Sequence, residues 1–217
     1  MKLLSDVFRS IRWGLGLPVS NLSLDSDSEE SIVDFYNRRI TNCEFLDDPE
    51  HYEHPRAERV LSVISGKNLL EIGCGNDGMT RLLSPKVESI TAFDISRPSL
   101  DEVERLGLPN VRTEQGLVEN FQPDEKFEWV VVSEVIEHLR KPKEVIRKAF
   151  EFVASGGAMV LTTPNGHWES DEHLHEFSLM MLTRLITSLD CESFECGYLR
   201  DRDNRRQSLR IEAKGAA

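Results

Sequence analysis

The chain has 217 residues, of which 38 are acidic and 26 basic, and its formal net charge is −12. This length fits one domain with a substantial buried core and leaves room for a small cap. The acidic balance favours solubility and repels polyphosphates at long range, which disfavours a nucleic-acid partner. No stretch approaches the ~20 apolar residues that a membrane-spanning helix needs. The four cysteines show no paired metal-ligand spacing and no disulfide framework, so the composition predicts a cytoplasmic protein in a reducing compartment.

The N-terminal 50 residues are predicted to form a segment of their own, ahead of a main domain over residues 51–217. Within residues 1–15, apolar residues recur at helical spacing, but Asp6 and Arg9 interrupt any signal-peptide core. An amphipathic helix of this kind can lie on a membrane surface, cover an active site or form a homodimer interface. A polar, acidic, serine-rich linker (20–31) and a cap helix are expected to follow.

Helix and strand patterns then alternate along the chain. Helices are predicted at 31–47 and 55–65, ahead of the first strand. Strands are predicted near 68–73, 89–94, 111–115, 127–133 and 158–163, and helices near 78–84, 97–106, 142–154 and 178–189. This alternation predicts a parallel sheet with right-handed crossovers. The last two strand-like stretches, 193–199 and 208–215, have no helix between them and predict a closing hairpin.

The most informative stretch is LLEIGCGNDGMTRLL (69–83), because an apolar strand breaks into closely spaced glycines and then into an amphipathic helix. Gly73, Gly75 and Gly78 allow a tight turn and a close approach to a ligand, and a helix start supplies unpaired N–H groups. Asp94 ends a second strand 19 residues after Gly75. An acid at about this spacing binds ribose hydroxyls in nucleotide sites.

Glu71 narrows the choice of ligand, because a carboxylate inside the first turn would repel a pyrophosphate. The ligand is therefore expected to be cationic at this end. S-adenosylmethionine (SAM) meets this requirement, since it combines ribose hydroxyls with an ammonium group and a sulfonium and has no phosphate.

At this point the chain resembles the class I, Rossmann-like SAM-dependent methyltransferases. The motifs behind the resemblance are LLEIGCG (69–75), FDIS (93–96), FEWVVVSEVIEHL (127–139) and GGAMVLTTPN (156–165), in the family's order and spacing. The resemblance implies a doubly wound α/β fold with seven mostly parallel strands, a C-terminal antiparallel hairpin and an N-terminal helical cap.

The resemblance also implies which residues bind the cofactor. In the family the glycine turn wraps the methionine moiety, the acid after the second strand binds the ribose, and backbone after the third strand meets the adenine. The positions expected to bind the cofactor here are Glu71, Gly73, Cys74, Gly75, Asp94, Ile95, Leu117 and Val118, with Ser133 and Glu134 after the fourth strand. Asp77 stands where the family usually has a third glycine, and Leu117 replaces an acid often found near the adenine. These departures keep a non-catalytic SAM-binding protein as an alternative.

The loop SEVIEHLRKP (133–142) is expected to carry the chemistry, because ligands of open α/β sheets bind beyond the carboxyl ends of the strands. Methyl transfer is an in-line displacement, so the enzyme mainly aligns the acceptor and accepts its proton. His138 is the predicted general base, with Glu137 beside it, although a histidine here can also simply support the loop. His175 is the third predicted catalytic residue. The expected acceptor is a small molecule methylated on oxygen or nitrogen, with carbon left open.

A weaker similarity gives an alternative. Glu134, Glu137 and His138, with the run from His173 to Phe177, resemble the magnesium-binding set of small-RNA 3′-terminal 2′-O-methyltransferases. In such enzymes a metal would bind the terminal ribose hydroxyls. The net charge and the rest of the pattern disagree with RNA, and a run like HLHEFS also occurs in ubiquinone-biosynthesis-like methyltransferases, where it starts a helix that lines the acceptor pocket. We therefore expect transfer to a small molecule without a metal.

Overall fold

The structure is a computed structural model, and it describes residues 29–38, 44–76, 78–166, 173–200 and 206–215. The amphipathic segment predicted at 1–15, most of the linker predicted at 20–31, and Asp77 lie outside the described residues. In the part that is described, no helix combines the length and the apolar character that crossing a membrane requires.

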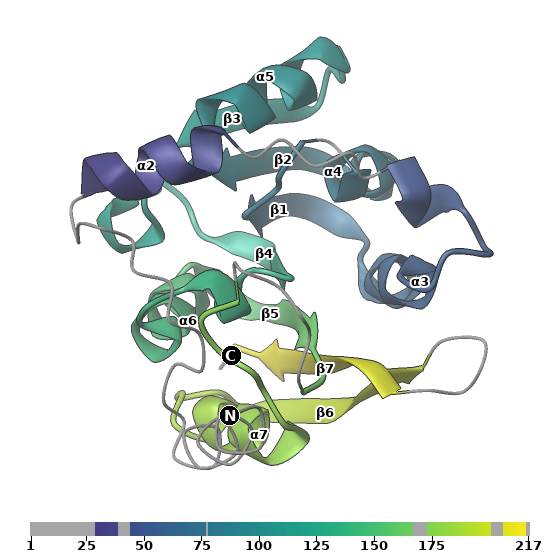
Figure 1. The fold of residues 1–217 in the computed structure, drawn as a ribbon, viewed down its shortest axis with the longest axis vertical. Helices are drawn as coiled ribbons and strands as arrows, with labels where there is room; N and C mark the ends of the chain where they lie inside the picture. The colour runs from purple at the N-terminus through teal and green to yellow at the C-terminus, as the bar shows by residue number, and fades with distance from the viewer. Residues whose placement is uncertain (1–28, 39–43, 77, 167–172, 201–205, 216–217) are drawn as a thin grey trace, which may run out of the picture.

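Seven strands form one sheet in the order β3-β2-β1-β4-β5-β7-β6 (Figure 1). They are β1 (Gly66–Ile72), β2 (Val87–Asp94), β3 (Val111–Gln115), β4 (Phe127–Ser133), β5 (Val153–Pro164), β6 (Ser193–Arg200) and β7 (Arg206–Lys214). The first five strands pair in parallel, whereas β7 runs antiparallel to both β5 and β6. The predicted mostly parallel sheet with a closing hairpin is confirmed.

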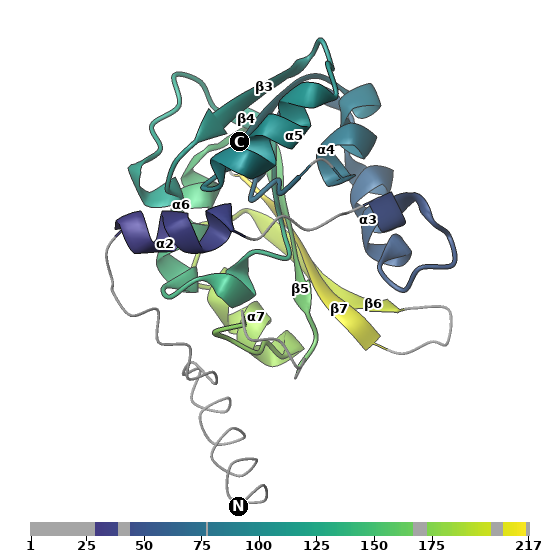
Figure 2. The same cartoon turned by 45° about the horizontal axis from the view of Figure 1, so that its top comes forward.

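Helices cover both faces of the sheet, as a doubly wound fold requires (Figures 1 and 2). One face packs against α3 (His54–Val63), α4 (Gly78–Leu83) and α5 (Arg97–Arg105), and the other against α6 (Pro142–Glu151) and α7 (Leu179–Ile186). Successive strand residues point to opposite faces. Leu70 and Ile72 of β1 therefore join the core under α6 and α7, and Leu69 joins the core under α3 to α5. Glu71, two residues after Leu69, faces the α4 side.

Two element predictions need correction. The helix predicted at 31–47 is not continuous: α2 spans Glu29–Asn37, and a separate 3-10 helix, η1, spans Glu44–Asp47. Helix α2 ends at Asn37 because asparagine is a weak helix former. The Asn37 side chain accepts a hydrogen bond from the backbone of α5. The helix predicted at 142–154 ends at Glu151. The backbone N–H of Phe127 in β4 donates to the Phe152 carbonyl, and Phe127 pairs with Val153, so that β5 begins there.

The strand order reverses between β1 and β4, since the chain first builds outward to β3 and then returns to the other side of β1. Open α/β sheets bind ligands in the crevice at such a point, beyond the carboxyl ends of the strands. The loops after β1 and β4 border this crevice. Helix α2 lies beyond these strand ends, apart from the helices that cover the faces (Figures 1 and 2).

Candidate active site

The glycine turn after β1 forms one wall of the crevice. Gly73 and Gly75 both have positive φ, 68° and 60°, a conformation that favours glycine. A Cβ on Gly73 would lie 2.4 Å from Cγ2 of Val135, so this glycine lets the turn pack against the loop after β4. A Cβ on Gly75 would meet no described atom within 4 Å. The turn is therefore closed on the protein side at Gly73 and open at Gly75, where a ligand can approach the backbone.

Asp94, at the end of β2, holds the turn in place. Its Oδ2 accepts a hydrogen bond from the Gly75 backbone N–H at 2.9 Å, and its Oδ1 accepts one from Ser96 at 2.8 Å. Burial raises the pKa of this carboxyl group, while these backbone hydrogen bonds act in the opposite direction. The backbone N–H of Ile95 bonds the same carboxyl group, which leaves about one of its roughly four acceptor positions open. The group is thus fixed beside the glycine turn and can still accept a bond from a ligand hydroxyl.

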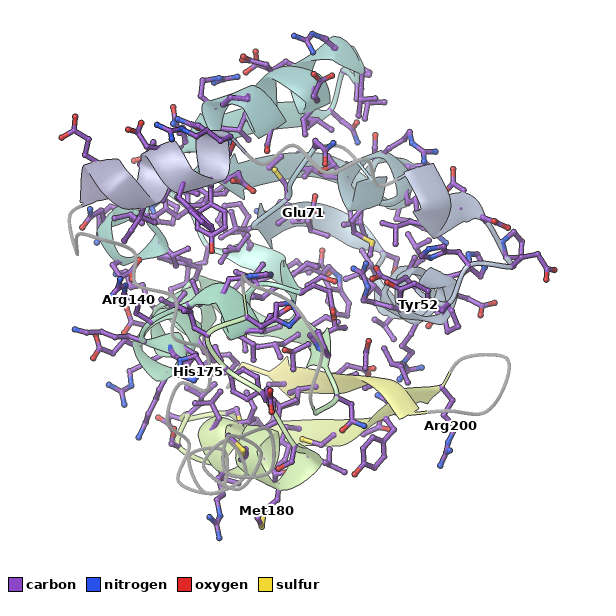
Figure 3. All side chains as sticks on the ribbon, in the orientation of Figure 1. Tyr52, Glu71, Arg140, His175, Met180 and Arg200 are labelled. Carbon is purple, nitrogen blue, oxygen red and sulfur yellow. The ribbon has the colours of Figure 1, made fainter. Side chains whose placement is uncertain are left out.

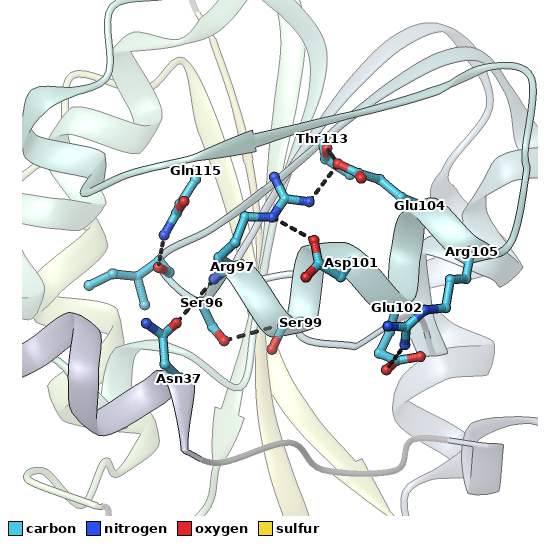
Figure 4. Close-up of polar contacts among 11 residues, drawn as sticks. Asn37, Ser96, Arg97, Ser99, Asp101, Glu102, Glu104, Arg105, Thr113 and Gln115 are labelled. Atoms are coloured by element: carbon cyan, nitrogen blue, oxygen red, sulfur yellow. Dashed lines mark hydrogen bonds and ion pairs between the residues drawn. The ribbon is translucent and has the colours of Figure 1, made fainter.

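The loop after β3 lies against the same acid. The backbone N–H of Gly116 donates to the Asp94 carbonyl at 3.0 Å. The Gln115 side chain donates to the Ile95 carbonyl at 3.0 Å, as Figure 4 shows. Leu117 and Val118 follow directly, at the start of the short helix η3 (Val118–Asn120). The structure therefore brings the predicted ribose and adenine segments together.

Glu71 is buried in the interior of the molecule (Figure 3), and its carboxylate accepts a hydrogen bond from the Thr80 hydroxyl of α4 at 2.6 Å. Burial raises its pKa to about 8. This contact fastens the helix that follows the glycine turn to the strand that precedes it. The prediction that Glu71 contacts the cofactor stays a prediction, and its Thr80 partner was missed because a helical threonine carries no signal of a buried acid nine residues earlier.

Polar groups from three elements meet at the end of β4. Arg56 of α3 donates to the Ser133 hydroxyl at 2.8 Å, and Ser133 bonds the Thr162 hydroxyl of β5 at 2.8 Å. Thr162 in turn bonds the carboxyl group of Glu134, which has a positive φ of 56°, unusual for a non-glycine residue. Burial raises the pKa of Glu134 to about 8.

Arg56 was not predicted from the sequence as a site residue. It is buried, with 8% of its surface exposed. Its guanidinium also pairs with Glu53, and its positive charge opposes the burial effect on the pKa of Glu71, Glu134 and Glu137. The sequence gives only a weak sign that Arg56 is buried, namely its place next to Ala57 on the apolar face of a predicted helix. Three buried acids near the carboxyl ends of β1 and β4 are thus influenced by one buried cation.

Glu137 and His138 lie in the short helix η4 (Ile136–His138) after β4. Glu137 is 1% exposed, and one carboxylate oxygen accepts a bond from the Thr163 hydroxyl at 2.9 Å. The other, Oε1, has no hydrogen-bond partner among the described residues and lies 3.8 Å from Nε2 of His138. The predicted acid and base are therefore adjacent. Burial raises the pKa of Glu137 to about 7.

The histidines after β5 divide between two surroundings. Ligand atoms of Glu137, His138 and His173 lie within 4.8 Å of one another, so these three described residues could hold a metal ion. His175 is not part of this group. Its buried ring bonds the backbone of Leu139 and Arg140, and burial lowers its pKa. The sequence predicted His175 as the histidine that acts with His138, whereas the structure places His173 beside His138.

A family model and several curated proteins match this chain. The family model described as "Methyltransferase domain" matches residues 48–195. The mitochondrial ubiquinone biosynthesis O-methyltransferase of Schizosaccharomyces pombe is 31% identical over 111 residues, which cover 48% of this chain and 40% of that protein. The chain spans about half or less of the length of these curated relatives.

Two solved structures show the same fold. The DhpI–SAH complex has a TM-score of 0.69 at 20% identity and covers 87% of this chain and 97% of that one. The N-methyltransferase NodS of Bradyrhizobium japonicum WM9, in complex with S-adenosyl-L-homocysteine (SAH), has a TM-score of 0.69 at 19% identity and covers 88% and 100%. At such low identity the likeness establishes the fold alone.

Proposed function

Because this chain belongs to the methyltransferase domain family, we propose that it transfers a methyl group from SAM to an oxygen or nitrogen of a small-molecule acceptor. The observation that carries the proposal is the Asp94 carboxylate at the end of β2, held by Gly75 and Ser96 beside the glycine turn that follows β1. It presents an acid for ribose hydroxyls beside an open glycine turn. SAM, when bound, supplies an electrophilic methyl group on its sulfonium.

The two sides of the crevice take different parts in this proposal. The residues proposed to bind the cofactor lie in the loops after β1, β2 and β3 and at the end of β4. They are Gly73, Cys74, Gly75, Asp94, Ile95, Leu117 and Val118, with Glu71 behind the glycine turn and Ser133 and Glu134 at the end of β4. Acceptor binding falls to the side of His138. The net charge of −12 opposes the pyrophosphate of NAD at long range, and the largely protonated Glu71 and Glu134 leave the oxygens near the glycine turn free to accept hydrogen bonds from an ammonium group.

His138 is proposed to accept the proton that the acceptor's hydroxyl or amine loses as it is methylated. The Glu137 carboxylate, 3.8 Å from the imidazole, would orient the ring and stabilise its protonated form. His175 would fix the backbone of Leu139 and Arg140 behind it, through its ring bonds to that segment. Each role uses a contact within the chain and none requires a metal.

Localisation in the cytoplasm is part of the same proposal. Cys74, Cys191 and Cys196 are free thiols, which supports a reducing compartment. The division of the chain at residue 50, the membrane-surface or dimer role of residues 1–15, and the absence of a nucleic-acid partner stay predictions.

The first test is calorimetric titration with SAH. Asp94→Ala and Asp94→Asn should weaken binding by ~1–3 kcal/mol, because ribose hydroxyls lose a charged acceptor. Glu119→Ala removes an exposed acid from η3 and serves as the matched control. Unchanged affinity in a folded Asp94 variant would remove the ribose assignment, and NAD binding of similar strength would contradict the proposed ligand class.

A further inference from the structure

Helix α2 contacts both sides of the proposed site. At its C-terminal end, the side-chain oxygen of Asn37 accepts a hydrogen bond from the backbone N–H of Arg97 at 3.1 Å (Figure 4). One residue earlier, the ring of Tyr36 lies edge-on to the ring of His138, with 6.4 Å between their centroids. The helix therefore joins the loop after β2, on the cofactor side, to the loop after β4, on the acceptor side.

The Asn37 contact fills a gap in the hydrogen bonding of α5. Arg97 is the first residue of that helix, where backbone N–H groups lack a partner within the helix. The N-cap Ser96 accepts from Ser99 at 3.3 Å, and Asn37 accepts from Arg97. The Arg97 side chain pairs with Asp101 at 2.7 Å and holds the donor residue to its own helix (Figure 4). Asn37 is thus attached to a well-fixed point.

That point lies three residues after the proposed ribose acid. Ser96, the neighbour of Arg97, donates its backbone N–H to Asp94 at 2.8 Å, on the carboxylate that also holds Gly75. The carboxylate, the turn and the donor to Asn37 therefore form one connected unit. The proposed ribose acid and the attachment point of α2 are thus connected through Ser96.

At the other contact, α2 brings aromatic rings to the proposed base. Tyr36 stands edge-on to Phe35 at 5.1 Å, and His138 stands edge-on to His173 at 5.0 Å. The four rings follow one another from α2 to the segment after β5, in the edge-to-face geometry that aromatic pairs prefer. The position of α2 therefore bears directly on the approach to His138.

We propose that Asn37 and Tyr36 are positioning residues that fasten α2 over the acceptor side of the site when the cofactor occupies the Asp94 side. The inference rests on the proposed function, because it takes Asp94 as the ribose-binding acid. It adds an order of binding: the wall beside His138 is completed only after the cofactor has bound.

Hydrogen exchange measured by mass spectrometry, with and without saturating SAH, tests the Asn37 contact. In the wild type, SAH should slow exchange in residues 29–37, 94–97 and 134–139. Asn37→Ala should lose the protection of 29–37 and weaken SAH binding about 2–10-fold, as expected for one lost hydrogen bond. Asn37→Asp keeps an acceptor oxygen and should keep the protection. Glu30→Ala, at an exposed position on the same helix, is the matched control.

The Tyr36 contact is tested in the same experiment. Tyr36→Ala should keep the protection of 94–97 and lose that of 134–139, whereas Tyr36→Phe, which keeps the ring, should retain both. Wild-type protection of 29–37 in Asn37→Ala would overturn the inference. So would unprotected wild-type α2 under conditions where calorimetry shows SAH bound. Absence of SAH binding itself would contradict the proposed function, and the inference with it.

Discussion

Glu137 illustrates how burial changes the chemistry of a carboxyl group beside a histidine. One of its oxygens is taken by Thr163 and the other faces Nε2 of His138 at 3.8 Å. Since burial raises its pKa to about 7, the group carries its charge only above neutrality. The charged form attracts a protonated imidazole and the neutral form does not. His138 should therefore work best as a base when Glu137 is ionised.

This gives a prediction for the proposed base. His138→Ala should lower kcat ~10²–10⁴-fold, the usual cost of losing an acid–base group, and leave SAH affinity unchanged. The wild-type rate should rise with pH through about 7 as Glu137 ionises, and Glu137→Gln, whose side chain does not ionise, should have a lower rate above pH 7 and a less steep rise. SAH release with a panel of phenols and amines would measure both effects.

His51→Ala is the control, since His51 lies in the turn before α3 and bonds the backbone of Glu53. Full turnover by His138→Ala would leave that histidine a supporting role in the loop. A wild-type pH profile that is flat between 6 and 8 would contradict the assignment to Glu137.

Between elements, the contact that matters most for the site is the one between β1 and α4. Glu71 and Thr80 join the two sides of the glycine turn inside the core. The folded state holds a proton on Glu71 up to a pKa of about 8, far above the ordinary glutamate value of about 4.5. Between these two values the folded chain binds more protons than the unfolded chain. Stability is therefore highest below the lower value and falls as pH rises through the higher one.

Glu71→Gln tests this link, because a glutamine keeps an acceptor for Thr80 and does not ionise. Across the window from about pH 5 to 8, one such proton changes the free energy of unfolding by about 1.4 kcal/mol per pH unit. The wild type should lose stability over this window more steeply than the variant in urea unfolding. Glu58→Gln, at an exposed position on α3, is the control. Parallel pH dependences for the wild type and Glu71→Gln would show that Glu71 is ionised in the folded state.

The elements that sequence predicted well are those with a local signal. Apolar runs marked β1 and β4, and the glycines marked the turn, because strand burial and positive φ act through the residues themselves. Arg56 and Asn37 could not be read in this way. Their roles depend on partners 77 and 60 residues away, Ser133 and Arg97, and no periodicity encodes such a contact.

At the scale of the molecule, the charge of −12 and the buried acids of the crevice point to the same kind of partner. Glu71, Glu134 and Glu137 converge on the end of the sheet where the cofactor is proposed to bind. The net negative charge repels polyphosphates, and the buried carboxyl groups gain their negative charge when a cation binds beside them or the pH rises above 7 to 8. This favours a cationic cofactor and a small acceptor over an RNA end.

Removal of metal ions by a chelator distinguishes metal-independent methyl transfer to a small molecule from metal-dependent methyl transfer to an RNA 3′ end. If Glu137 orients His138 as a base, EDTA should leave methyl transfer to the small-molecule panel intact, since the two groups act on each other directly at 3.8 Å. His173→Ala should then cost little, because its ring lies beside His138 and takes no part in the proposed proton transfer. A metal held by Glu137, His138 and His173 predicts the opposite: EDTA abolishes turnover, added Mn²⁺ or Co²⁺ restores it, and His173→Ala fails like His138→Ala. A short RNA with a free 3′ end, assayed beside the panel, separates the substrates. Methylation of that RNA, lost with EDTA and restored by metal, would replace the small-molecule proposal.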